Sequence, residues 1–177
     1  TRDIAVRFNN IYGETFKVPE AYVPKAGARV MGLGNPTSKM SKSDPNGCVF
    51  LMEKPEDIAR KFKRAITDSD TENCVRFDPE NKPGVSNLMN IYSAVTGKSF
   101  DEIEREFEGQ GYGVFKPAVG DAVIETLRPI REEATRLLND KAYLCSVYTE
   151  GAQKASVIAR KTLRKVYKKV GLVEKPF

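Results

Sequence analysis

Apolar residues recur at helical spacing along most of the chain, and only the first third interrupts this pattern with long polar stretches. The opening segment predicts a helix that ends at Gly13, because its apolar positions fall at i, i+4, i+7 and i+8. These positions are Ile4, Phe8, Ile11 and Tyr12. Residues 28–33 (ARVMGL) then predict a short strand. Residues 34–47 (GNPTSKMSKSDPNG) predict a long surface loop, since they have no apolar period and many turn formers.

Three helices are predicted between residues 55 and 107. The first begins at Pro55, the second is stopped by Gly97, and the third begins with a capping box formed by Ser99 and Glu102. Their predicted inward positions are Ile58, Phe62, Ala65, Ile66, Val85, Leu88, Met89, Tyr92, Val95, Ile103 and Phe107.

Longer helices are predicted in the last third of the chain. One apolar stripe runs from Phe115 to Leu138, and Pro129 is expected to kink or break that helix. Asp140 is predicted to cap a short helix, and a final helix is predicted over residues 151–171. The inward positions predicted for the final helix are Ala155, Ile158, Ala159, Val166 and Val170. These patterns predict a mainly α fold, in which a short mixed piece (1–50) precedes a helical bundle (51–177).

The composition is that of a soluble globular protein. The chain has 177 residues, of which 40% are hydrophobic and 30% charged. No run approaches the roughly 20 apolar residues that cross a bilayer, and residues 1–10 lack the basic and apolar regions of a signal peptide. We therefore expect a cytoplasmic protein that makes no membrane contact.

The cysteine and histidine contents limit the chemistry. Cys48, Cys74 and Cys145 are far apart, form no CxxC motif, and have no histidine anywhere in the chain to complete a metal site. We expect free thiols and no metal ligands from the protein. Without an imidazole, catalysis must rest on lysines, hydroxyls, carboxylates or backbone dipoles.

Charge is distributed unevenly around a net value of +5. From Lys154 to Lys175 there are eight basic residues and one acid, whereas from Asp101 to Glu108 there are five acids and one arginine. A basic C-terminal stretch indicates a polyanionic partner, and a solvated helix face explains it equally well.

The loop at residues 34–47 carries the clearest chemical signal. Two ammonium groups, on Lys39 and Lys42, stand three residues apart among the hydroxyls of Ser38, Ser41 and Ser43. Such a loop suits a polyphosphate, especially one whose charge rises as a P–O bond breaks. Neither GxxxxGK[ST] nor GxGxxG is satisfied here. By composition alone, a lysine-rich loop without a ligand remains the alternative.

The order of letters in this loop changes the interpretation. Residues 39–43 read KMSKS, which is similar to the signature of class I aminoacyl-tRNA synthetases. The segments GARVMGLGNPTSKMSKSDPN, RAITDSD, GVSNLMNIYSAVTG and GAQKASVIARKTLRKVY resemble tryptophanyl-tRNA synthetases of the bacterial type. The resemblance covers essentially the whole chain.

The resemblance implies an enzyme that activates L-tryptophan with ATP, releasing pyrophosphate, and then transfers the amino acid to tRNA(Trp). It makes Lys39 and Lys42 the catalytic residues that grip the pyrophosphate portion, Lys42 more directly. It places Val30, Met40, Ser41 and Ser43 with them at the ATP site, the backbone of Val30 against adenine. It also implies Mg²⁺ as a companion of ATP. Residues 1–50 would end the Rossmann-like α/β catalytic domain, and residues 51–177 would form the helical domain that binds the anticodon.

The same resemblance implies partners beyond the small molecules. Candidate tRNA contacts are Arg60, Lys63, Arg64, Arg160, Lys161 and Arg164. Family members form homodimers through the Rossmann half. That half is mostly absent here, and the histidine of the HIGH-type ATP signature is missing, so we expect a C-terminal portion with little or no adenylation activity by itself. The alternatives are a stand-alone RNA-binding helical module without catalysis and a scaffold domain.

Overall fold

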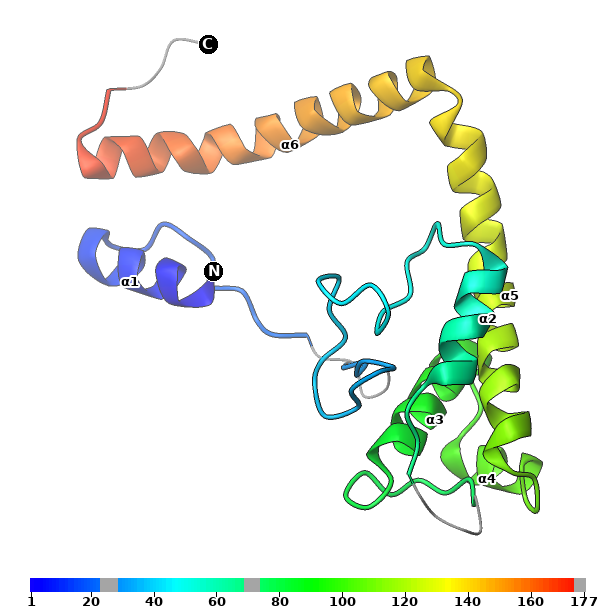
Figure 1. The fold of residues 1–177 in the computed structure, drawn as a ribbon. Helices are drawn as coiled ribbons and strands as arrows, with labels where there is room; N and C mark the ends of the chain where they lie inside the picture. Colours follow the sequence, from blue (N-terminus) through cyan, green and yellow to red (C-terminus); the bar gives the residue numbers. More distant parts are fainter. Residues whose placement is uncertain (23–28, 69–73, 174–177) are drawn as a thin grey trace. The chain divides into compact units, whose positions relative to one another are not determined.

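The computed structural model describes residues 1–22, 29–68 and 74–173, and within these the chain is helical (Figure 1). The helices are α1 (Arg2–Tyr12), α2 (Pro55–Arg64), α3 (Pro83–Thr96), α4 (Phe100–Glu106), α5 (Tyr112–Leu138) and α6 (Lys141–Val170). The mainly α fold predicted from the sequence is confirmed. None of the helices in the described ranges combines the length and apolarity needed to span a membrane.

Two compact units divide the chain. One unit comprises Thr1–Tyr22 with Arg136–Phe177, and the other comprises Val23–Thr135. The first therefore holds α1 and α6, and the second holds α2, α3, α4 and most of α5. These units are defined by compactness and are not the family domains predicted at 1–50 and 51–177, which stay a prediction.

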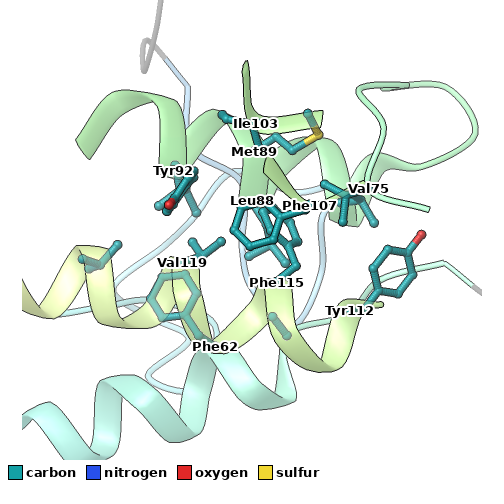
Figure 2. Close-up of a cluster of buried hydrophobic side chains, with 14 of the residues drawn as sticks. Phe62, Val75, Leu88, Met89, Tyr92, Ile103, Phe107, Tyr112, Phe115 and Val119 are labelled. Atoms are coloured by element: carbon teal, nitrogen blue, oxygen red, sulfur yellow. The ribbon is translucent and has the colours of Figure 1, made fainter. Parts of the chain in front are cut away.

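The core of the second unit lies among α2, α3, α4 and the first half of α5 (Figure 2). Its largest fully buried side chains are Ile58, Phe62, Val85, Leu88, Met89, Ile103, Phe115 and Val119. Helix α5 approaches α2 closely at Gly120, where an added Cβ would lie 3.1 Å from the Cβ of Phe62. The inward positions predicted for the first three of these helices are buried or half-buried except Ile66, which is exposed.

Local signals at the helix ends behave as the sequence predicted. Pro55 occupies the first turn of α2 as predicted, where its missing N–H has no intrahelical partner to lose. Pro83 occupies the same position in α3, although this was not predicted from the sequence. Ser99 and Glu102 form the reciprocal capping box of α4. Glu102 has a lowered pKa because its carboxylate accepts hydrogen bonds from Ser99, first of all from the backbone N–H. Gly97 ends α3 with a φ of 76°, in the left-handed region.

Two predictions about regular structure are wrong, that of a strand before the loop and that of two helices after Asp140. Residues 29–33 form no strand, and their β structure is an isolated antiparallel bridge between Met31 and Lys39; Ala28 lies outside the described residues. Helix α5 continues through Pro129 without a break, and Val123 and Leu127 pack against the core just before it; a kink at Pro129 stays a prediction. The two helices predicted after Asp140 are one.

Helix α6 runs unbroken through Gly151, since a single interior glycine costs only about 1 kcal/mol relative to alanine. Asp140 caps it as predicted, accepting a hydrogen bond from the Tyr143 N–H at 2.9 Å. Its predicted inward face is wrong for the described residues: α6 has no buried residue, and Ile158 is 73% exposed. Near its end, the Lys169 ammonium donates to the carbonyls of Gly13 and Glu14 at 3.1 and 3.0 Å, which joins α6 to the end of α1.

Candidate functional site

The lysine-rich loop (residues 34–47) rises from a short paired base. The Gly32 N–H donates to the Ser38 carbonyl at 2.9 Å, and the Met40 N–H donates to the Val30 carbonyl at 3.0 Å. These two hydrogen bonds set Lys39 opposite Met31. The base therefore fixes the backbone at Lys39, at the start of the KMSKS run.

A buried side chain of α3 holds this base against that helix. Asn87 of α3 is 4% exposed, and its amide makes two hydrogen bonds to the backbone of Met31. Asn87 Oδ1 accepts from the Met31 N–H at 2.9 Å, and Asn87 Nδ2 donates to the Met31 carbonyl at 2.9 Å. The amide thus binds Met31 as a neighbouring strand would. Loss of this pair would leave buried polar groups unsatisfied.

Side-chain turns shape the rest of the loop. Asn35 accepts hydrogen bonds from the N–H and hydroxyl of Thr37 at 3.1 and 2.7 Å. The Ser41 Oγ accepts from the Ser43 N–H at 3.3 Å, and Asp44 Oδ1 accepts from the Asn46 N–H at 3.2 Å. These local turns follow from the asparagine, aspartate and serine content of the loop.

The loop presents its two lysines to solvent. Lys39 and Lys42 are exposed, and neither forms an ion pair or side-chain hydrogen bond within the described part of the chain. Met40, between them in sequence, is half-buried and packs against the core of the second unit. An apolar anchor thus separates two ammonium groups that are available to an anion. Val30, the other predicted nucleotide contact, is also half-buried against this core.

The predicted tRNA contacts fall in both units. Arg60, Lys63 and Arg64 lie on α2, whereas Arg160, Lys161 and Arg164 lie exposed on α6. On α2, Arg60 forms an ion pair with Asp57. Lys63 and Arg64 are exposed, and neither has an ion pair or side-chain hydrogen bond with a described residue.

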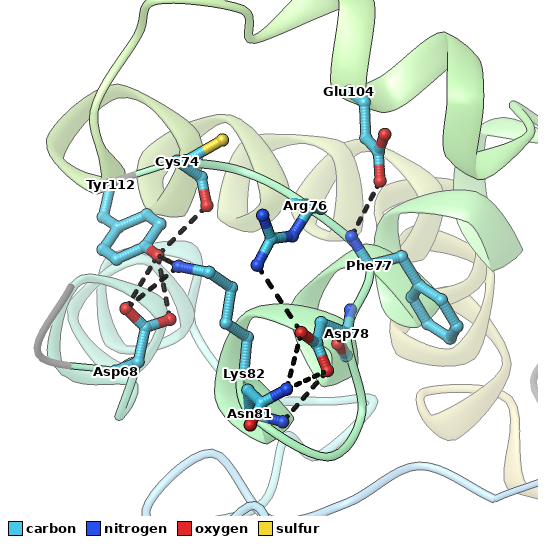
Figure 3. A network of polar contacts seen from close by, with 10 residues as sticks. Asp68, Cys74, Arg76, Phe77, Asp78, Asn81, Lys82, Glu104 and Tyr112 are labelled. Atoms are coloured by element: carbon cyan, nitrogen blue, oxygen red, sulfur yellow. Dashed lines mark hydrogen bonds and ion pairs between the residues drawn. The ribbon is translucent and has the colours of Figure 1, made fainter. Parts of the chain in front are cut away.

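A second polar cluster joins α3 to α5 (Figure 3). Lys82 is 4% exposed; its ammonium lies 3.3 Å from Asp68 Oδ1 and donates to the Tyr112 hydroxyl at 3.0 Å. That hydroxyl lies 2.8 Å from Asp68 Oδ2. Burial first, and then the Asp68 carboxylate, raise the pKa of Tyr112 to about 12, so the phenol is neutral at physiological pH.

Comparison with known proteins assigns the family. Residues 1–128 match the family described as class I tRNA synthetases (W and Y). The chain belongs to this family. A tryptophan–tRNA ligase of Wolinella succinogenes is 53% identical over 175 residues, covering 98% of this chain and 52% of the relative. The ligase of Clostridium tetani is 52% identical, covering 98% and 51%. The chain thus spans about half the length of the curated relatives it matches.

Solved structures of synthetases agree with this assignment. The crystal structure of tryptophanyl-tRNA synthetase from Mycoplasma pneumoniae aligns with a TM-score of 0.84 at 28% identity, covering 98% of this chain and 54% of that one. The Campylobacter jejuni enzyme, complexed with ADP and tryptophan, aligns with a TM-score of 0.66 at 32% identity, covering 97% and 52%. The family resemblance inferred from the KMSKS loop is therefore confirmed.

Sequence reasoning missed one residue that supports the synthetase loop. Asn87 was passed over because it falls between apolar positions of α3. The available signal was its position: α3 buries Ser86 and Asn87 together with Val85, Leu88 and Met89. A buried amide must have hydrogen-bond partners, so an asparagine on this face already implied that backbone or polar groups meet α3 there.

Proposed function

We propose that the enzyme carrying this chain is a tryptophan–tRNA ligase. It activates L-tryptophan with ATP and transfers the amino acid to tRNA(Trp), with AMP and pyrophosphate as the other products. One observation carries the proposal. In a chain of this family, the lysines of the KMSKS loop stand exposed and unpaired with described residues, on a base that Asn87 holds in place.

The chemistry explains why two free ammonium groups matter. A tryptophan carboxylate oxygen attacks the α-phosphorus of ATP, the bond to the bridging oxygen breaks, and pyrophosphate leaves with the electron pair. Negative charge therefore grows on the leaving group, and Lys39 and Lys42 are proposed to stabilise it. Ser41 and Ser43 would add hydroxyl donors, with Met40 packed beneath them. Because the base is already fixed, little rearrangement of Lys39 is needed at the moment of reaction.

One further contact of this chain is proposed for the nucleotide. Val30 is proposed to meet the adenine ring through its backbone: its carbonyl accepts from Met40, while its N–H makes no hydrogen bond with a described residue. Mg²⁺ is proposed to accompany ATP as a companion of its phosphates. The part proposed for this chain in the step is that of its lysines, hydroxyls and backbone.

The tRNA is proposed to bind along the helices. Arg60, Lys63 and Arg64 on α2, and Arg160, Lys161 and Arg164 on α6, would contact backbone phosphates. The remaining length of the enzyme would supply the tryptophan pocket and the homodimer interface, and the enzyme would act in the cytoplasm.

Replacement of Lys42 tests this assignment. In the enzyme of full family length, we expect Lys42→Ala to slow tryptophan-dependent ATP–pyrophosphate exchange by roughly two to three orders of magnitude. Lys42→Arg should retain part of the rate because it keeps the charge without the same geometry. Lys17→Ala is the control, since Lys17 is exposed and lies outside the loop. Exchange at the unaltered rate in Lys42→Ala would remove the proposed role.

A further inference from the structure

A small pocket lies between the loop and α2. Its volume is about 230 Å³. That volume is below the roughly 300–1,000 Å³ typical of pockets for whole small molecules, so it suits one chemical group rather than a complete nucleotide. The pocket is lined by Leu33, Gly34, Asn46, Arg60, Lys61, Arg64 and Ala65.

The pocket carries an excess of positive charge. Arg60 is paired with Asp57, and Lys61 is paired with Glu53 at 2.5 Å. Arg64 lines the same pocket, is exposed, and has no ion pair or hydrogen bond with any described side chain. Three cations against two carboxylates leave one unneutralised guanidinium.

Uncharged donors stand on the loop side of the pocket. The Gly34 N–H makes no hydrogen bond with a described residue, and neither does the Asn46 side-chain amide. Asp44 is the nearby acid of the loop. Its carboxylate is engaged in a local turn, where it accepts a hydrogen bond from the Asn46 N–H. A guanidinium and free N–H groups facing one small space are the donors that proteins use for phosphate.

We propose that this pocket binds a single phosphate group, which bridges Arg64 and the backbone of Gly34. The phosphate would belong to a tRNA phosphodiester or to the phosphate chain of a nucleotide, and this choice of ligands rests on the proposed function. Binding of the phosphate would connect the loop to α2 beside Leu33, whose backbone already bonds to the end of the loop and to the segment that follows α2. Next to Gly34, the N–H of Leu33 donates to the Gly47 carbonyl at 2.9 Å, and the carbonyl of Leu33 accepts from Ile66 at 2.8 Å.

Arg64→Ala tests the site. Because the Arg64 side chain has no partner among the described residues, its loss should leave the fold intact. With tRNA, we expect roughly tenfold weaker binding at moderate salt, and a slope of log affinity against log salt reduced by about 0.7–0.9. Anisotropy titrations across a salt series measure both quantities. Lys54→Ala is the matched control: it removes one charge from an exposed lysine at the other end of α2, outside the pocket. A parallel calorimetric titration with pyrophosphate tests the nucleotide source.

A second variant approaches the pocket from the loop. A Cβ added at Gly34 meets nothing within 4 Å, so Gly34→Asp can place a carboxylate there without a clash. We expect it to weaken binding of the same ligand at least as much as Arg64→Ala does. A loss confined to tRNA identifies a backbone phosphate, and a loss confined to pyrophosphate identifies the nucleotide. If the unaltered enzyme binds both ligands and neither variant changes either affinity, the site is wrong while the proposed function stands. If the unaltered enzyme binds neither tRNA nor pyrophosphate, the phosphate site and the proposed function are both wrong.

Discussion

The phenol of Tyr112 lies between two opposite charges, and its neutral form stabilises the fold of its unit. It bridges the Lys82 ammonium and the Asp68 carboxylate, at 3.0 and 2.8 Å, and is only 6% exposed. Ionisation there would create a phenolate with little hydration beside a carboxylate. For this reason the pKa of Tyr112 in the folded protein, about 12, exceeds the ordinary value of about 10.

We expect Tyr112→Phe to lower the free energy of unfolding by about 1–3 kcal/mol at pH 8, because buried polar partners lose a hydrogen bond. The folded chain keeps the Tyr112 proton to higher pH than the unfolded chain does. The contribution of Tyr112 is therefore complete below pH 10 and declines between pH 10 and 12, by roughly 1.4 kcal/mol per pH unit at most. Urea unfolding at pH 8, 10 and 11 should show the difference between variant and unaltered protein shrinking with pH.

Tyr143→Phe is the control for this series, since Tyr143 is 50% exposed. Its effect should stay near zero at every pH. A Tyr112→Phe difference that stays constant from pH 8 to 11 would show that the phenol does not titrate as its surroundings require.

Elements that pack against the rest of their unit were predictable from the sequence, and the exceptions have local physical causes. Apolar spacing, Pro55, Gly97 and the Ser99 capping box located α2, α3 and α4, because burial and capping act within a few residues. The predicted strand is not formed over residues 29–33, because Asn87, 56 positions from Met31, occupies the hydrogen bonds that a partner strand would make.

The candidate site also has one part that the sequence predicted and one part that it did not. The order of letters in KMSKS singled out Lys39 and Lys42, and the two are exposed as a binding role requires. The pocket beside them was not predictable, because it joins Gly34 to Arg64, thirty positions further along the chain. Only the three-dimensional fold brings the Gly34 N–H and the Arg64 guanidinium to the same pocket.

The link between α3 and the loop gives an element-scale prediction. Asn87→Ala removes two hydrogen bonds and leaves the N–H and carbonyl of Met31 without them, so we expect a loss of about 2–3 kcal/mol in the free energy of unfolding. The amides of Gly32 and Met40, which close the base, should exchange faster with solvent. Denaturant unfolding and hydrogen exchange read out the two effects.

Asn90→Ala is the matched control on the same helix. Asn90 is half-buried, and its side chain makes no hydrogen bond with a described residue. We expect a smaller loss of stability and no change at Gly32 or Met40. Equal effects of the two variants on the loop amides would mean that Asn87 does not hold the base.

At the scale of the whole chain, the two compact units differ in how much apolar surface they bury. Helix α3 buries eight residues from Gly84 to Tyr92, whereas α6, although it is more than twice as long, buries none among its residues. Most helical stability in proteins comes from packing of an apolar face rather than from helix propensity. The long helix therefore depends on its own backbone hydrogen bonds and on a few contacts such as that of Lys169 with Gly13 and Glu14.

This imbalance predicts that the 177-residue chain opens in stages. Amides of α6 should exchange with solvent at free energies well below that of global unfolding, while those of α3 approach the global value. Helix α5 supplies the control within one element, since it buries residues from Tyr112 to Val123 and none from Ile124 to Leu138. Protection measured by mass spectrometry should fall along α5 in that direction. Uniform protection along α5, together with α6 as protected as α3, would mean that packing does not set local stability in this chain.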